Sequence, residues 1–276
     1  LVEAFGFSTL ELYGEFTDVI VTNNSALTSF VFYAPVINAD ISYNSILKGI
    51  DVSTLLQLDT LYVKDCKLQS LDVTKNLALT SLDCNNNELT TLDVSNNTSL
   101  VKFYCNKNQL PKINVTANTA LQEFDIADNL LSTINLRNNT ALTYLNISNN
   151  AEISMLNVQH NTSLEVLVAS GLAITDIDLT ANTALKGAEL FNTNLTATKK
   201  LDTTGLGVVD ERRLRDPSSL RSVRMTPTLN LFLSDYSFII AIMEYDFNTK
   251  HYTLNIQNSR HHHPLCLGAV SFGAIF

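Results

Sequence analysis

Three sets of residues in this chain have side chains that could bind a metal: four cysteines, the run His261 to His263, and a column of aspartates that recurs along the sequence. Imidazole and thiolate groups bind zinc, whereas carboxylates bind calcium. His261 and His263 would share one face of a strand, but no aspartate or glutamate stands at ligand spacing, so we predict no metal site there. The sequence also lacks a glycine-rich phosphate loop, a nucleophile elbow and a His-Glu-x-x-His motif. We therefore predict a chain that is not an enzyme and needs no cofactor.

Composition excludes further classes of protein. The 276 residues are 45% hydrophobic and 16% charged, which is typical of a folded chain. A net charge of -9 would repel a phosphate backbone, so a nucleic acid is not the expected partner. No run of about 18 apolar residues is present to span a membrane. The chain begins at Leu1 rather than at methionine, and we expect an extracellular or cell-surface protein whose export signal has been removed.

The aspartates and two of the cysteines belong to a repeat of 21 residues. One copy reads LTSLDCNNNELTTLDVSNNTS, from Leu79 to Ser99. The step between copies is 21 residues, except for one step of 22. Successive copies open at Leu58, Leu79, Leu100, Leu121, Leu142, Leu164 and Leu185. A constant period of this length is typical of a solenoid, in which each copy is one turn stacked on the next.

Each copy contains two short segments in which apolar and polar residues alternate. Leu82-Asp83-Cys84 and Leu92-Asp93-Val94 are the two segments of one copy, and this alternation is the period of a strand with one buried face. Roughly ten residues per half leave no room for a helix and its turns, and aspartate, asparagine, threonine and valine form helices poorly. We therefore predict a mostly β solenoid with two short parallel strands per turn, stacked about 4.8 Å apart.

Two columns of asparagine follow the two predicted strands, where the chain turns and backbone groups lose their sheet partners. The side chain of a buried asparagine has N–H donors and an acceptor, which can bridge its own turn and the next. We interpret both columns as structural ladders rather than as ligand sites. The first contains Asn87, Asn108, Asn129 and Asn150, and the second contains Asn76, Asn97, Asn118, Asn139, Asn161 and Asn182.

The repeat also gives the cysteines and aspartates a structural interpretation. Cys84 and Cys105 occupy one inward column, one turn apart, and Cys66 occupies the first asparagine column. Side chains that project in parallel from neighbouring strands have poor disulfide geometry, so we predict buried free thiols. The exposed centre of the second strand is aspartate or asparagine in each copy. A calcium ion between Asp72 and Asp93 is one interpretation, and a hydrated polar face is the one we favour.

The segment Leu79-Thr-Ser-Leu82-Asp-Cys84-Asn-Asn-Asn87-Glu-Leu89 resembles the highly conserved segment of leucine-rich repeats. Its continuation, Thr90 to Asn97, is similar to the bacterial 21-residue class, the irregular or IRREKO-type repeats of internalin-like proteins. The resemblance covers Leu27 to Leu206. It implies a leucine-rich-repeat fold at a bacterial surface or in a secreted product, and binding or adhesion rather than catalysis, although a fold alone does not specify a partner.

Both ends of the chain depart from the repeat. The stretch from Leu1 to Phe16 lacks it, and we interpret Val36 to Ser45 as either a lost half-turn or a bulging loop. After Leu206 the repeat stops, and the residues from Phe238 to Ile256 predict a strand, a turn and a strand. The predicted division is an N-terminal cap over residues 1–26, a solenoid over 27–206 and a C-terminal cap or small β-rich module over 207–276.

The last segment also carries a basic cluster. We expect it to be a solvated or capping face, and docking on an acidic partner or a polysaccharide is the alternative. The cluster contains Arg212, Arg213, Arg215, Arg221 and Arg224.

Two functions of different class agree with this organisation: a binding module for a protein or glycan, and a spacer or adhesin stalk that presents the C-terminal module. A spacer should expose uniform threonine, serine, asparagine and aspartate, whereas a binder should expose clustered aromatic and charged residues. Packing of Tyr62 against Tyr104 would be a purely structural explanation for two of the exposed aromatics. We favour a binding face on the first strands, and the resemblance points to this same sheet, normally the concave one. The predicted face contains Tyr62, Lys64, Lys102, Tyr104, Glu123 and Tyr144.

Overall fold

The computed structural model describes residues 8–14, 16–33 and 35–195, together with the backbone of five later strands at 207–209, 228–232, 238–246, 251–258 and 270–273. The chain divides into two compact units. The first comprises Leu1–Leu185 and Asn192–Asp202, and the second comprises Lys186–Phe191 and Thr203–Phe276. Each unit is described by itself. No helix of the described residues is long and apolar enough to cross a membrane.

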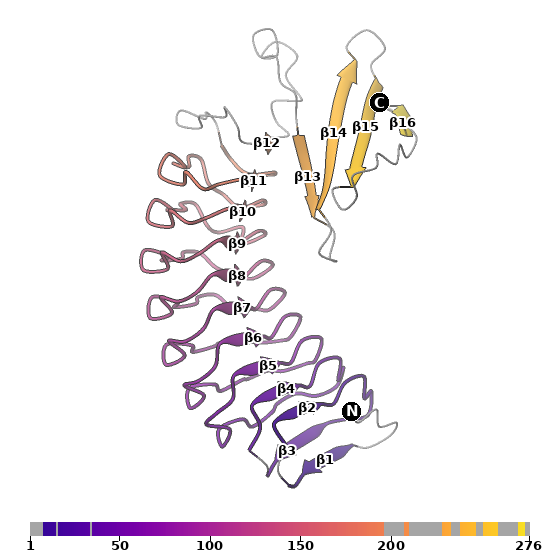
Figure 1. Ribbon diagram of the computed structural model, residues 1–276, viewed down its shortest axis with the longest axis vertical. Helices are drawn as coiled ribbons and strands as arrows, with labels where there is room; N and C mark the ends of the chain where they lie inside the picture. Colours follow the sequence, from indigo (N-terminus) through magenta and orange to yellow (C-terminus); the bar gives the residue numbers. More distant parts are fainter. Residues whose placement is uncertain are drawn as a thin grey trace. The chain divides into compact units, whose positions relative to one another are not determined.

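The first unit is a solenoid whose turns each add one short strand to a parallel sheet, the main sheet (Figure 1). The strands pair in parallel with the next turn, and the middle residues of successive strands are aligned, as in Leu61, Leu82 and Phe103. The strands that this unit contributes to the main sheet are β2 (Asp18–Ile20), β4 (Asn38–Asp40), β5 (Thr60–Tyr62), β6 (Ser81–Asp83), β7 (Lys102–Tyr104), β8 (Glu123–Asp125), β9 (Tyr144–Asn146) and β10 (Val166–Val168). The predicted fold class, a mostly β leucine-rich-repeat solenoid, is confirmed.

The core of the solenoid is a stack of equivalent apolar layers, one from each turn. The residue at the centre of each strand points inward and is buried, and the residues that open the copies are buried with it. Phe103 and Phe124 take the place of leucine in two consecutive turns, and their rings stack 5.3 Å apart. Burying apolar surface stabilises the fold by roughly 25 cal/mol per Å². Because each turn buries its apolar side chains against adjacent turns, the stability of the array is shared between neighbours.

The second half of the turns forms the predicted strand only near the N-terminus of the described residues, at β1 (Thr9–Leu12) and β3 (Ser29–Phe32), with a single bridge from Val31 to Asp51. From Leu71 onward burial alternates there as expected, since Leu71 and Val73 are buried and Asp72 is exposed, but no strand forms in the second halves up to Leu185. The reason is competition for backbone groups. The carbonyl oxygen of Val73 accepts the backbone N–H of Asn76 at 3.0 Å and the side-chain Nδ2 of Asn97 at 2.9 Å. Tight turns and asparagine amides therefore use the groups that a second strand would have offered to its neighbour.

The solenoid extends into the region where the sequence pattern is lost. Residues Val36 to Ser45, interpreted above as a lost half-turn or a bulging loop, form strand β4 of the main sheet and its flanking turns. Ala39 occupies the inward position that leucine fills in later turns, and this substitution hides the repeat. Strand β2 lies within the predicted cap and pairs with β4. The preceding strand β1 (Thr9–Leu12) pairs in parallel with β3 (Ser29–Phe32), apart from the main sheet.

The first asparagine ladder joins consecutive turns through both ends of each amide. Asn108 is buried, and its Nδ2 donates to the carbonyl oxygens of Cys84 at 3.0 Å and Cys105 at 3.3 Å. Its Oδ1 accepts the backbone N–H of Leu89 at 3.0 Å. The same arrangement recurs at Asn87, Asn129 and Asn150.

The second ladder joins the turns through the Nδ2 atoms alone. Asn118 donates to the carbonyl oxygens of Val94 at 2.9 Å and Asn97 at 2.8 Å. Its Oδ1 is buried and accepts no hydrogen bond from the residues that the structure describes. Six asparagines share both features: Asn76, Asn97, Asn118, Asn139, Asn161 and Asn182.

A third column of residues adopts the left-handed backbone conformation, immediately before the first ladder. Asparagine and aspartate tolerate this conformation better than most residues, and glycine tolerates it best. Lys107, with φ of 52°, is an exception to this preference. Gly171 has φ of 71°, and a Cβ at this position would lie 2.5 Å from Oδ1 of Asn149. The column contains Asn23, Tyr43, Asp65, Asn86, Lys107, Asp128, Asn149, Gly171 and Asn192.

The described residues of the second unit form six strands. Strand β11 (Gly187–Glu189) pairs in parallel with β12 (Gly207–Val209). An antiparallel sheet follows, in the order β13 (Thr228–Phe232), β14 (Phe238–Asp246), β15 (His251–Asn258) and β16 (Val270–Gly273). The predicted strand, turn and strand correspond to β14 and β15. The histidine run, the arginine cluster and Cys266 lie outside the described residues.

Candidate functional site

The exposed side of the main sheet presents two columns of side chains, and we call this surface the sheet face. The register places Lys102, Glu123 and Tyr144 in one column on three consecutive turns. The other column alternates between acidic and other residues from turn to turn. It runs Asp40, Tyr62, Asp83, Tyr104, Asp125 and Asn146.

The six predicted site residues all lie on or beside this sheet face, between β5 and β9. Nζ of Lys102 lies 3.1 Å from Oε1 of Glu123, and the hydroxyl of Tyr104 donates to Oε2 of the same glutamate. Glu123 therefore connects a lysine and a tyrosine on the neighbouring strand. Tyr62 is 36% exposed, so its ring is available for contact with a partner. Whether these residues bind a ligand remains a prediction.

Lys64 brings two further residues into the site. Its Nζ lies 3.9 Å from Oδ2 of Asp83 and 5.4 Å from the centre of the Tyr43 ring. The ammonium is therefore placed between a carboxylate and an aromatic face, an arrangement that attracts a cation. Sequence reasoning did not include Tyr43 because it follows β4, the strand that the pattern hides.

Partial burial perturbs the two carboxylates at the centre of the sheet face. Burial raises the pKa of Asp83, opposed by a hydrogen bond from the backbone N–H of Asn85 and by the charge of Lys64. Burial also raises the pKa of Asp125, opposed by bonds from the backbone N–H of Ala127 and from side-chain amides. In both cases the surroundings stabilise the negative charge less well than water does.

The aspartate column in the second half of the turns has a different role. Oδ1 of Asp72 accepts the backbone N–H of Thr74 at 2.9 Å, and Oδ1 of Asp93 accepts that of Ser95 in the same way. Hydrogen bonds from Thr74 lower the pKa of Asp72. Asparagine makes the equivalent bond at Asn114, so the column holds local turns and does not require a charge.

The described cysteines are free and buried. Cys84 and Cys105 share an inward column, and burial raises the pKa of the Cys84 thiol well above its usual range. Burial likewise raises the pKa of Cys66 to about 11. Thiols in this state are poor nucleophiles. Among the described residues, no group of three histidine, cysteine, aspartate or glutamate side chains is arranged to hold a metal ion.

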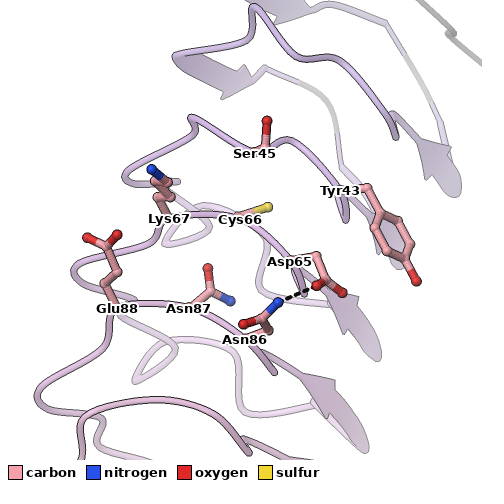
Figure 2. A pocket seen from close by; sticks show the side chains of 8 residues that line it. All are labelled: Tyr43, Ser45, Asp65, Cys66, Lys67, Asn86, Asn87 and Glu88. Atoms are coloured by element: carbon pink, nitrogen blue, oxygen red, sulfur yellow. Dashed lines mark hydrogen bonds between the residues drawn. The ribbon is translucent and has the colours of Figure 1, made fainter.

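A shallow hollow lies where Cys66 replaces an asparagine of the first ladder. Figure 2 shows Asp65 and Asn86 side by side at its margin, where Nδ2 of Asn86 donates to Oδ1 of Asp65. The lining mixes carboxylates, amides, an ammonium, two hydroxyls and a thiol, so it favours no single class of ligand. The lining residues are Tyr43, Ser45, Asp65, Cys66, Lys67, Asn86, Asn87 and Glu88.

The stacked turns, the inward leucines and the asparagine ladders define a leucine-rich-repeat fold, and solved structures support this. The functional domain of InlJ from Listeria monocytogenes, which includes a cysteine ladder, matches with a TM-score of 0.52 at 23% identity, over 85% of this chain and 69% of that chain. Internalin InlF from the same species matches with a TM-score of 0.57 at 22% identity, over 74% of this chain and 72% of that one.

Internalin C2 of Listeria monocytogenes gives a TM-score of 0.58 at 20% identity, over 63% of this chain and 80% of that chain. No protein-family model and no curated protein sequence matches. The shared property is therefore the fold, and the predicted resemblance to internalin-like leucine-rich repeats is confirmed at that level.

Proposed function

We propose that this chain is an extracellular or cell-surface binding module that recognises a protein or glycan through the sheet face. The observation that carries the proposal is the difference between the two halves of each turn. In the second halves from Leu71 to Leu185, the exposed column consists of aspartate and asparagine alone, which accept backbone N–H groups of their own turns. The sheet face contains such residues too, but tyrosines, lysines and a glutamate stand among them on consecutive short strands.

Rigid presentation of aromatic and charged groups favours recognition. Tyrosine offers a large contact area and a polar tip at a low cost in conformational entropy. The ladders hold each strand to the next, so the sheet face loses little freedom when a partner binds. A uniform spacer would not need this composition, and the sheet face therefore favours the binding module over the adhesin stalk.

The test compares two double variants of the full chain. The parent chain is first used to capture surface proteins and glycans from the native host's surroundings. Replacing Tyr62 and Tyr104 by alanine should then weaken binding of the captured partner at least tenfold, about 1.4 kcal/mol. The control replaces Tyr13 and Tyr33, which are 63% and 57% exposed, stack on each other and lie outside the main sheet. Equal affinity of both double variants would remove the sheet face as the binding site.

A further inference from the structure

Two acidic residues of the sheet face occupy equivalent positions but have different partners. Asp83 is paired with Lys64, which lies on the preceding turn. Two turns later, Asp125 stands in the same relation to Asn106, whose Nδ2 donates to Oδ2 of Asp125 at 2.9 Å. The register from β6 to β8 aligns the two pairs. Asp125 is therefore equivalent to Asp83, except that its partner on the preceding turn is a neutral amide and not a lysine.

The surroundings of Asp125 contain no compensating positive charge in the described part of the chain. Its Oδ1 accepts the backbone N–H of Ala127 at 3.1 Å, and its Oδ2 accepts the Asn106 amide. Both donors are neutral, and so is the side-chain amide of Asn146, which also bonds this carboxyl group. Lys64 and Lys102, the lysines of the sheet face, already lie against Asp83 and Glu123. A half-buried carboxylate with neutral donors alone gains most from an added cation.

An aromatic ring stands beside Asp125, as one does beside Lys64. Tyr104 precedes Asp125 by one turn in the same column. Lys64 shows what such a site accepts, because its ammonium lies over the Tyr43 ring and beside the Asp83 carboxylate. A carboxylate next to a tyrosine suits the planar guanidinium of arginine in particular, which can bind the carboxylate and stack on the ring.

We infer that the partner of the sheet face is a protein segment rich in arginine or lysine, with one cation bound to Asp125 beside Tyr104. This inference rests on the proposed function, because it concerns the same surface. The spacing agrees with a segment in the polyproline II conformation. Acidic residues recur on every second turn at Asp40, Asp83 and Asp125, roughly 9.6 Å apart. A polyproline II chain rises about 3.1 Å per residue with roughly three residues per turn. A basic residue at every third position would therefore point to the same side at about this spacing.

The first test measures binding of a synthetic peptide in which every third residue is arginine, by isothermal titration with the full chain. Asp125→Asn should weaken binding about tenfold. The control, Asp72→Asn, removes the same charge from the second half of a turn and should change the affinity by less than about twofold. Asparagine is already present in both columns, at Asn146 and Asn114, where it accepts the same backbone bond. Neither variant should therefore disturb the fold.

A second pair of variants adds a charge instead of removing one. Asn106→Lys should place an ammonium beside Asp125, as Lys64 stands beside Asp83, and should compete with the peptide to a similar extent. Asn96→Lys is the matched control, because Asn96 is exposed on another edge and its column already contains Lys75. A peptide with glutamate in place of arginine should bind none of these chains.

Three outcomes would overturn the inference. Equal weakening by Asp125→Asn and Asp72→Asn would show that bulk charge alone attracts the peptide. Unchanged affinity in Asn106→Lys would show that the cation binds elsewhere. A captured partner that is a neutral glycan, insensitive to Asp125→Asn, would also overturn it. If the double Tyr62 and Tyr104 variant still loses its captured partner, the proposed function stands without the basic segment, and if that variant binds normally, both fail.

Discussion

The backbone N–H of Leu89 donates to Oδ1 of Asn108 at 3.0 Å, so a side chain of one turn completes the backbone of the turn before it. Replacing Asn108 by alanine leaves that N–H without a partner in a buried position, whereas the carbonyl oxygens of Cys84 and Cys105 each lose one of two side-chain donors and keep the other, from Asn87 and Asn129. We expect the free energy of unfolding to fall by about 1–3 kcal/mol.

The second ladder provides the comparison for that experiment. Asn118→Ala also removes two donated bonds, but it removes with them an Oδ1 that is buried and accepts no bond from the described residues. We therefore expect Asn118→Ala to cost less than Asn108→Ala in urea denaturation. A larger loss of stability in Asn118→Ala would show that the bond accepted by Oδ1 of Asn108 does not determine which ladder contributes more.

Lys107 offers a stabilising substitution. It adopts the left-handed conformation with φ of 52°, which costs a residue such as lysine roughly 1–2 kcal/mol. Lys107→Asn should raise the free energy of unfolding by about 0.5–1 kcal/mol, because asparagine tolerates this conformation better. The control is Lys112→Asn, which removes the same charge from an exposed residue of the same turn with a negative φ. A gain of the same size in the control would assign the effect to charge.

Alanine substitutions at Gly171 and Gly49 test whether backbone conformation and available space, and not the loss of a glycine as such, determine the change in stability. A Cβ at Gly171 would lie 2.5 Å from Oδ1 of Asn149, and φ there is 71°. A Cβ at Gly49 would meet nothing within 4 Å. Gly171→Ala should therefore destabilise the chain by at least about 1 kcal/mol, whereas Gly49→Ala should be neutral or slightly stabilising. Thermal melting of the two variants measures the difference. Equal shifts of the melting temperature would contradict this prediction.

The sheet face should contribute an unusual pH dependence to stability. Burial raises the pKa of Asp125 in the folded state, so folding favours its protonated form. The contribution of this group is therefore complete below the pKa of the unfolded chain, about 4, and is lost as pH rises through the folded pKa. Asp125→Asn should become more stable relative to the parent as pH rises from about 4 to 7, as measured by denaturant midpoints.

Asp72 should give the opposite sign. Hydrogen bonds from Thr74 lower its pKa, so its contribution is present above the unfolded pKa and is lost as pH falls through the folded pKa. The advantage of the parent over Asp72→Asn should therefore grow on going from strong acid to about pH 5. Parallel pH profiles for Asp72→Asn and Asp125→Asn would contradict both assignments.

The repeat predicted the solenoid because its spacing is a property of the sequence alone. It failed at β4, where Ala39 occupies an inward position and the leucine signal disappears. The neighbouring residues do carry a signal, since Ile41 and Asn44 are buried in the expected columns. The alternation in the second half predicted burial correctly. It could not predict that a strand forms there at β1 and β3 but not from Leu71 onward, because alternation does not specify which groups bond the backbone.

The candidate site was predictable only in part. Its exposed positions follow from the register, and Tyr62 and Tyr104 could be placed on one face without a structure. The ion pair between Lys64 and Asp83 forms because the lysine side chain extends to the next turn, and the repeat pattern does not specify side-chain conformation. The uncompensated state of Asp125 likewise becomes visible only when its donors are seen to be neutral.

The sheet face and the scaffold beneath it repeat with different periods. Buried apolar residues recur on each described turn, and the second ladder recurs on each turn from Asn76 to Asn182, whereas aspartate and tyrosine alternate in one column of the face, from Asp40 through Tyr62, Asp83 and Tyr104 to Asp125. Duplicating one turn would lengthen the scaffold but place two like residues in succession. Duplicating two turns would extend scaffold and face together. A gene that grows by single repeats can therefore gain length freely, but it can extend this surface only by inheriting turns in pairs.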